Sequence, residues 1–178
     1  METAVTITTS PEVVDARVPR NRVAAETTSD QHSLPDWHQL LAAFRGEIGR
    51  SPGDNLVTRW ASDFASLHRV RHLNPNRTAE IDCRREQLVI LVNSWTETHV
   101  TTTSHGASAT RSFGAAADVL AAAYVAAEYC LMAAEDASAA PVHAAWERAA
   151  ELACRWNDLV AENPGRWHPS GVADQDRR

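Results

Sequence analysis

The stretch TAEIDCRREQLVILVNSWTETH, residues 78–99, predicts one long central helix. On a helical wheel that starts at Ile81, Leu88 and Trp95 fall within about 40° of that residue and form a buried stripe. Arg85 lies at the same angle as these apolar residues. A guanidinium keeps its charge at any ordinary pH, so inside a buried stripe it needs a carboxylate partner or an anionic ligand. The central helix therefore predicts either a structural ion pair or an anion site at Arg85.

Apolar residues at helical spacing predict four further helices. Pro, Gly and polar clusters divide them, as expected at helix ends. The first predicted helix is short, starts at Ser33–Asp36 and ends near residues 46–49, and the second covers residues 55–73. The fourth helix begins at Thr110. The fifth has Pro141 at its first position and ends at residues 163–165. The expected N-caps of the second and central helices are Asp54 and Thr78.

These elements predict an all-α fold. We expect an antiparallel bundle of four main helices plus a short N-terminal helix, because consecutive helices are joined by short connections. The bundle domain spans residues 33–168, between flexible tails at 1–32 and 169–178.

Composition excludes several classes of protein. The formal net charge is −6 and all 17 basic residues are arginine, so general nucleic-acid binding and binding to anionic membranes are not expected. The sequence also predicts no signal peptide and no transmembrane run, and therefore a cytoplasmic protein. Glycine-rich phosphate loops, nucleophile elbows and CxxC pairs are not found, which favours a protein without a cofactor.

A set of polar residues interrupts otherwise apolar stripes. Asp63 and Arg71 lie on or near the stripe of the second helix, Arg85 lies on that of the central helix, and Glu128 lies at the edge of the fourth. One interpretation is a buried network of ion pairs that fixes the helix register, with Arg85 paired to Asp82. The other is a pocket in which arginines hold a small anionic substrate and a carboxylate acts as a base.

The second interpretation names candidate site residues. The candidate catalytic carboxylates are Asp63, Asp82 and Glu128. The candidate substrate ligands are Arg71, Arg85, His68 and Tyr124. His68 and His72 are spaced i,i+4, but this spacing without further ligands is weak evidence for zinc, so no metal is expected.

A series of short motifs resembles an actinobacterial family of small all-helical domains of unknown function. The matching elements are Glu80-Ile81-Asp82-x-Arg84-Arg85-x-x-Leu88-Val89 followed by Trp95, Leu67-His68-x-x-Arg71-His72, Phe113-Gly114 with Asp118, and His143-Ala144-x-Trp146 with Ala150–Leu152 and Asp158-Leu159. The resemblance covers roughly residues 35–168. The sequence departs from the family pattern at Arg111, where an acid is expected, and at Val119, where an arginine is expected.

The resemblance implies a helical domain that associates with itself or with a related helical protein. It also implies a role in bacterial specialised metabolism, with one candidate activity. That activity is a subunit of the cyclases that close an aziridine ring by expelling sulfate from an amino-sulfate ester. The alternative is a non-catalytic helical partner that stabilises another protein. A homodimer or heteromer is also consistent with Ile90, which points away from the buried stripe, and with the alanine-rich fourth helix.

Overall fold

The structure is a computed structural model that describes residues 33–100 and 112–163. Within these ranges all the regular structure is helical, which confirms the predicted all-α class. The elements are α2 (Trp37–Arg45), α3 (Leu56–Leu73), the 3-10 turn η1 (Pro75–Arg77), α4 (Thr78–His99), α5 (Phe113–Ala133) and α6 (Ala140–Glu162).

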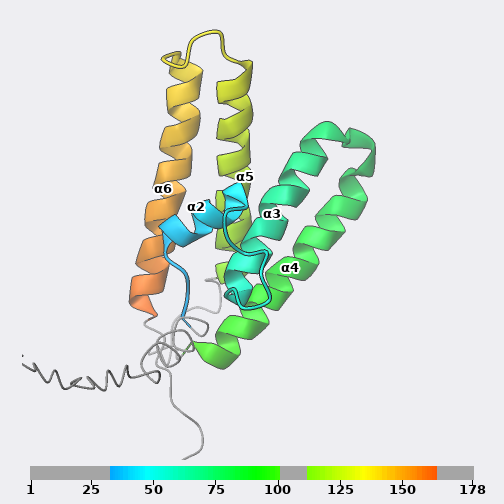
Figure 1. The fold of residues 1–178 in the computed structure, drawn as a ribbon, viewed down its shortest axis with the longest axis vertical. Helices are drawn as coiled ribbons and strands as arrows, with labels where there is room; N and C mark the ends of the chain where they lie inside the picture. Colours follow the sequence, from blue (N-terminus) through cyan, green and yellow to red (C-terminus); the bar gives the residue numbers. More distant parts are fainter. Residues whose placement is uncertain (1–32, 101–111, 164–178) are drawn as a thin grey trace, which may run out of the picture.

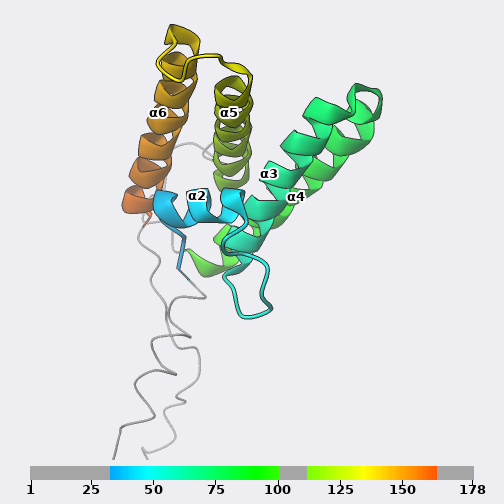
Figure 2. The ribbon, with the colours of Figure 1, turned by 45° about the horizontal axis from the view of Figure 1, so that its top comes forward.

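The four long helices form two hairpins, α3–α4 and α5–α6, which diverge toward their turns (Figure 1). The short helix α2 crosses α5 and α6 on one side (Figure 2). Helix α5 packs against each of the other α-helices, whereas α6 packs on α5 and α2 and contacts neither α3 nor α4. α5 is therefore the element on which the two hairpins meet.

The core gathers where α2, α3, α4 and α6 meet α5. The predicted stripe of α4 is confirmed, since Ile81, Leu88, Val92 and Trp95 are all buried. The largest side chains of the core with under 2% exposure include Trp156, Phe44, Phe64, Leu40 and Leu120. Helical spacing from Leu120 and Tyr124 predicts a buried Leu131, but this residue is 39% exposed because it lies in the last turn of α5, near the tip of the α5–α6 hairpin.

Two predicted helix caps are wrong. Asn55, not Asp54, caps α3 by accepting a hydrogen bond from the Val57 amide at 2.8 Å. The Asp54 carboxylate instead accepts from the amides of Gly49 and Ser51, and so closes the preceding loop.

Thr78 does not cap α4, because it is the first helical residue. Its hydroxyl donates to the Pro75 carbonyl at 2.7 Å, and Arg77 occupies the cap position without a side-chain hydrogen bond.

Two other predicted starts differ by small shifts. Ser112 caps α5 by accepting from the Ala115 amide, whereas Thr110 lies outside the described residues. Pro141 is the second residue of α6, which begins at Ala140. At the N-terminal side, Asp36 caps α2 in a capping box with Gln39, as the predicted start allows.

Helices α4 and α5 approach closely at Gly114. A Cβ atom at this position would lie 2.4 Å from the Val89 carbonyl oxygen, so a side chain does not fit there. Asn93 reinforces the contact: its Oδ1 accepts from the Gly114 amide at 2.9 Å, and its amide group donates to the Ser112 hydroxyl at 2.9 Å. A glycine and an asparagine thus fix the start of α5 against α4.

Among the described helices, α5 alone has the length and apolar composition that would let it cross a membrane, contrary to the expectation from sequence. Its two acidic residues, Asp118 and Glu128, are both ion-paired to neighbouring helices. These pairs fit a helix packed inside a protein better than one surrounded by lipid.

Candidate functional site

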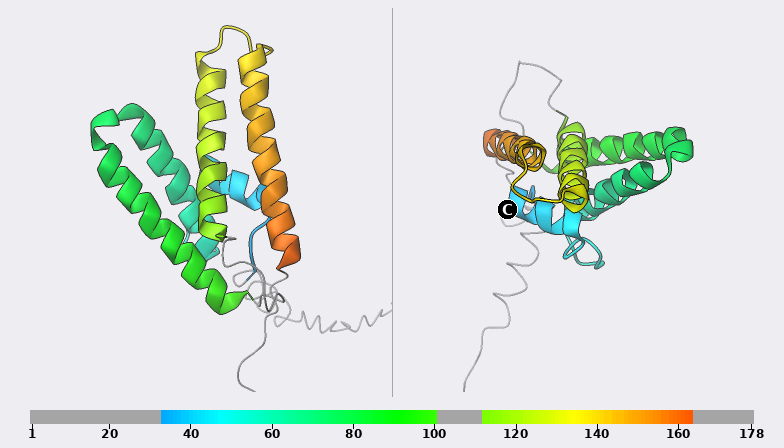
Figure 3. Two further views of the ribbon diagram at one scale, coloured as in Figure 1. Left: turned by 180° about the vertical axis from the view of Figure 1, so that it is seen from behind. Right: turned by 90° about the horizontal axis from the view of Figure 1, so that it is seen from above.

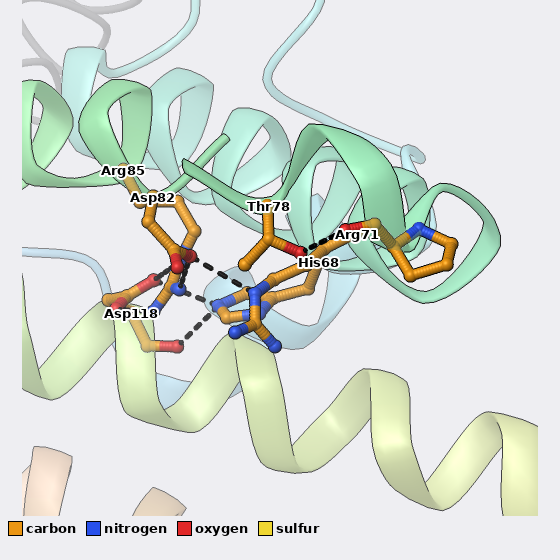
Figure 4. A network of polar contacts seen from close by, with 7 residues as sticks. His68, Arg71, Thr78, Asp82, Arg85 and Asp118 are labelled. Carbon is orange, nitrogen blue, oxygen red and sulfur yellow. Dashed lines mark hydrogen bonds and ion pairs between the residues drawn. The ribbon is translucent and has the colours of Figure 1, made fainter. Parts of the chain in front are cut away.

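A chain of charged side chains joins α3, α4 and α5 (Figure 4). Asp118 of α5 stands at its centre and is 8% exposed. Its Oδ1 accepts from His68 Nε2 at 2.8 Å and from Arg85 Nε at 2.9 Å, and its Oδ2 accepts from Arg85 Nη2. Arg85 also donates through Nη1 to Asp82 Oδ1 at 2.7 Å, and Arg71 donates through Nε to the same oxygen at 3.1 Å. We call these five residues the α3–α4–α5 network.

The position of Asp118 explains its protonation state. Burial alone would raise the pKa of the Asp118 carboxyl, but the hydrogen bonds from His68 and Arg85 and the charge of Arg85 outweigh it and hold that pKa below its ordinary value. The carboxyl is therefore ionised at neutral pH. The two hydrogen bonds that Arg85 donates to the Asp118 carboxylate, together with the contact to Asp82, raise the pKa of Arg85 above its ordinary value.

The ionised Asp118 also assigns the tautomer of His68. Nε2 lies 2.8 Å from Asp118 Oδ1 and 3.2 Å from the Asp118 main-chain oxygen, and both atoms are acceptors. Nε2 must therefore carry the hydrogen, which leaves the lone pair of the neutral ring on Nδ1. A histidine oriented in this way by a carboxylate can act as a general base.

The network is already balanced in charge. Two arginines, Arg71 and Arg85, face two carboxylates, Asp82 and Asp118. Arg85 uses Nε, Nη1 and Nη2 on these carboxylates, so its fork is occupied from within the chain. Such an arrangement locks helix register more readily than it receives a second anion. The predicted pairing of Arg85 with Asp82 is confirmed, but Asp118 is the closer-bound partner.

A second, smaller cluster joins α2, α3 and α5. Arg69 of α3 donates to the Glu128 carboxylate through Nη2 at 2.7 Å and through Nε at 3.2 Å, and it also donates to the Phe44 main-chain oxygen at 2.9 Å. Burial and the neighbouring Glu128 carboxylate raise the pKa of Tyr124 to about 12. Glu128 is thus paired to Arg69 rather than to Arg71 or Arg85.

The structure brings together four of the seven site residues predicted from sequence. His68, Arg71, Asp82 and Arg85 share the α3–α4–α5 network. Glu128 belongs to the second cluster, and Tyr124 is a core residue whose ring packs against Phe44 at 5.5 Å and Trp146 at 5.7 Å.

Asp63 is exposed on α3, so its predicted place in a buried stripe is wrong. The buried residues next to it, Phe64 and Ala65, occupy the inward face of the helix instead. Asp63 therefore takes no part in either cluster.

Sequence reasoning missed Asp118 and Arg69 as members of these clusters. Asp118 carried a usable signal, since it and Glu128 are the only charged residues in the alanine-rich helix α5. An isolated acid on such a helix needs a cationic partner, and that requirement would have pointed across to Arg85. Arg69 carried no comparable signal, because the next arginine along the helix, Arg71, is an equally plausible partner by spacing.

Other polar groups give no sign of a further ligand. His72, the i,i+4 neighbour of His68, stacks on Tyr129 with ring centroids 3.9 Å apart. In residues 33–100 and 112–163, no group of three or more His, Cys, Asp or Glu side chains is arranged to hold a metal ion. Every buried side-chain nitrogen or oxygen in the same ranges has a hydrogen-bond partner. His105, a candidate lid residue by sequence, and Trp167, a candidate to cover a partner or a pocket mouth, lie outside the described residues.

Comparison of the chain with protein-family models, with curated proteins and with solved structures found no match. The resemblance to the actinobacterial helical family therefore stays a prediction from the motifs.

Proposed function

We propose that this protein is a non-catalytic helical partner, located in the cytoplasm, that binds and stabilises another helical protein. The observation that carries the proposal is the outward face of α5. Its exposed residues between Ala115 and Ala133 are all apolar, although a helix face in contact with water normally carries polar residues. In this proposal the four long helices form an antiparallel bundle around α5 that is open between α4 and α6.

The saturated network supports the same function. Arg85, the residue that first indicated an anion site, has its donors on Asp82 and Asp118. A binding protein needs only the rigid scaffold that such a network gives, because its function depends on the surface rather than on a reactive group.

Site-specific photo-crosslinking tests the proposal. A photoreactive residue at Val119, which is 45% exposed on α5, is compared with one at Ala150, which is exposed on α6, outside the apolar face of α5. We expect a protein-sized adduct in host cells from position 119 and none from position 150. If position 119 gives no adduct, or if both positions give the same adducts, the proposal is wrong.

A second function is favoured by one specific observation, the orientation of His68 by Asp118. In this alternative the chain is a subunit of a cofactor-free enzyme that acts on a small anionic substrate, for example an amino-sulfate ester. His68 Nδ1 would take a proton from the ammonium, the nitrogen would attack the carbon that bears the ester, and sulfate would leave with the electrons of the C–O bond. Arg71, whose side chain is 46% exposed, would contact the anion, and Asp82, which also binds Arg85, would hold the Arg71 side chain in place.

Sulfate binding separates the two functions. In isothermal titration calorimetry, the enzyme alternative predicts saturable sulfate binding that Arg71→Met weakens and Arg59→Met, a change at an exposed arginine on the same helix, leaves intact. Absence of saturable binding to the unmodified protein would contradict the enzyme alternative and leave the interaction function as the conclusion.

A further inference from the structure

His68 has one ring nitrogen that is anchored and one that is open. Its side chain is 10% exposed, and its Nε2 is held by the carboxylate and the main-chain oxygen of Asp118, at 2.8 Å and 3.2 Å. In residues 33–100 and 112–163, no group is hydrogen-bonded to Nδ1. Every buried side-chain nitrogen in these ranges has a partner, so Nδ1 is not buried. The fold therefore leaves Nδ1 of a nearly buried histidine accessible.

The anchored nitrogen makes the open one a nucleophile. Because Nε2 donates its hydrogen to Asp118, the neutral ring has its lone pair at Nδ1. Histidine forms covalent intermediates through such a lone pair. When Nδ1 forms a new bond, the ring becomes a cation, since Nε2 keeps its hydrogen. The ionised Asp118 carboxylate already lies where this cation needs a counter-charge.

Arg71 selects the kind of group that Nδ1 would attack. It follows His68 by three residues on α3, a spacing that places two side chains on one face of a helix. Arg71 donates to Asp82 through Nε at 3.1 Å, and its side chain is 46% exposed. Within the part of the chain that the structure describes, Nη1 and Nη2 of Arg71 donate to no acceptor. This edge of the guanidinium matches the paired oxygens of a phosphoryl group.

The surrounding helices leave this part of the molecule uncovered by α6. His68 and Arg71 belong to α3, which packs on one side of α5 together with α4 (Figure 4). α6 contacts neither α3 nor α4 and lies on the opposite side of α5 (Figure 3). A small molecule that reaches His68 therefore does not have to displace α6.

We propose that His68 is a phosphoryl-acceptor site, at which Nδ1 takes a phosphoryl group from an activated donor and becomes a phosphohistidine. The donor class is an acyl phosphate or a phosphoramidate, in which phosphorus carries a good leaving group. The inference is independent of the proposed interaction function, because that function uses the outward face of α5.

The transfer needs no proton movement on the protein. The Nδ1 lone pair forms the N–P bond while the bond from phosphorus to the leaving group breaks, and the donor departs with that electron pair as a carboxylate or as ammonia. Asp118 stabilises the ring cation, and Arg71 contacts the phosphoryl oxygens. The group is held by a covalent bond, so the site needs no affinity for a free anion in a network whose charges are balanced.

Intact-mass spectrometry of the full-length protein after incubation with acetyl phosphate or with phosphoramidate tests the site. We expect a gain of one phosphoryl group that is lost in acid and kept in alkali, as for an N–P bond. Phosphorus NMR should place the group on Nδ1, because Nε2 is bound to Asp118. An adduct with one donor alone supports the site and assigns its donor class. No adduct with either donor, or a group on Nε2, would overturn the proposal.

The position of the group separates a built site from general reactivity, since the chain has eight histidines. Peptide mapping should find His68 modified faster than His143, although His143 is exposed on α6 and His68 is nearly buried. In urea this preference should disappear, because the contact with Asp118 is lost. Equal rates at His68 and His143 in the folded protein would overturn the proposal.

Two substitutions test the roles of the neighbours. Arg71→Gln, at an exposed position, should slow the reaction about threefold, as loss of one exposed ionic contact predicts. Arg59→Gln, at an exposed arginine of the same helix, should have no effect. Asp118→Asn should slow it at least about tenfold, as loss of a hydrogen bond between charged groups predicts, with folding checked by circular dichroism. Equal rates for Arg71→Gln and Arg59→Gln would overturn the proposed site even if Asp118→Asn does not fold.

Discussion

Helix α5 is held on its two sides by different kinds of contact. Toward α3 and α4 its apolar packing is joined by charged contacts, with Asp118 bound by His68 and Arg85. Toward α6 and α2 it is attached through apolar and aromatic packing, with Trp156 against Phe113 at 5.9 Å and Trp146 against Tyr124 at 5.7 Å. The comparison indicates that apolar packing supplies most of the stability on both sides, whereas the charged contacts fix how the α3–α4 hairpin is aligned.

The largest effect is expected on the apolar side. Trp156 is 1% exposed, and its Nε1 donates to the Pro35 carbonyl at 2.8 Å. Trp156→Ala should lower the free energy of unfolding by about 3–5 kcal/mol, because it leaves a large cavity. Urea denaturation followed by circular dichroism measures this, with Leu131→Ala at a 39% exposed position as the control. Equal losses in the two variants would remove the distinction between core and edge of the α5–α6 hairpin.

Breaking the charged side should cost somewhat less. Asp118→Ala leaves Arg85 and His68 without their carboxylate, at a cost of about 3 kcal/mol, the lower end for a buried pair since the Arg85 side chain keeps 20% exposure. The same denaturation experiment measures it. Glu80→Ala, which breaks the exposed pair with Arg77, should leave stability unchanged.

A triple change sharpens the comparison. Replacing His68 with Leu, Arg85 with Met and Asp118 with Leu removes the buried charges together, so no group is left unpaired. This variant should be at least as stable as Asp118→Ala and close to the unmodified protein. A triple variant less stable than Asp118→Ala would mean that the charges supply stability themselves, contrary to the role in alignment assigned to them.

A smaller effect is expected at Gly114, where α5 lies close to the backbone of α4. In Gly114→Ala, the new Cβ would lie 2.4 Å from the Val89 carbonyl oxygen, so the helices must separate. We expect a loss of about 1–3 kcal/mol. Gly53→Ala is the matched control, because a Cβ at Gly53 meets no atom within 4 Å. Equal stability of the two variants would contradict the close approach of α4 and α5.

The smallest effect is a dependence on acid. The pKa of Asp118 is lower in the folded protein than in the unfolded chain, so the unfolded chain takes up the proton first as pH falls. The contribution of Asp118 to stability is complete above its ordinary pKa of about 3.9 and is lost progressively below it. The difference in unfolding free energy between the unmodified protein and Asp118→Asn should therefore shrink below that pH. A constant difference down to the acid unfolding transition would contradict the lowered pKa.

The contrast between the two sides also explains what could be predicted from sequence. The buried stripe of α4 and the all-α class followed from periodicity, because apolar spacing depends only on the helix itself. The pairing of Arg85 with Asp82 followed for the same reason, since both lie on one helix three residues apart.

The remaining contacts depend on neighbours that spacing does not reveal. Asp118 lies 33 residues from Arg85 in the sequence, and their meeting depends on how α5 docks on α4. Asn55 rather than Asp54 caps α3, because the Asp54 carboxylate closes the preceding loop by accepting from the Gly49 and Ser51 amides. The apolar surroundings of Asp118 in the sequence call for a cationic partner, but the docking of α5 on α4 and the loop geometry at Asp54 do not follow from helical spacing, whereas the stripe of α4 does.

Asn93 has a consequence for how the protein folds. A new helix has free amide groups at its first turn, and two of these in α5 are tied to Asn93: the Gly114 amide directly, and the Ala115 amide through the Ser112 hydroxyl. The first turn of α5 is thus completed by a side chain from α4. Hydrogen exchange at these two amides should follow separation of α4 from α5 rather than fraying of one helix end. Nucleation of α5 and docking of α4 would then be one cooperative event rather than two.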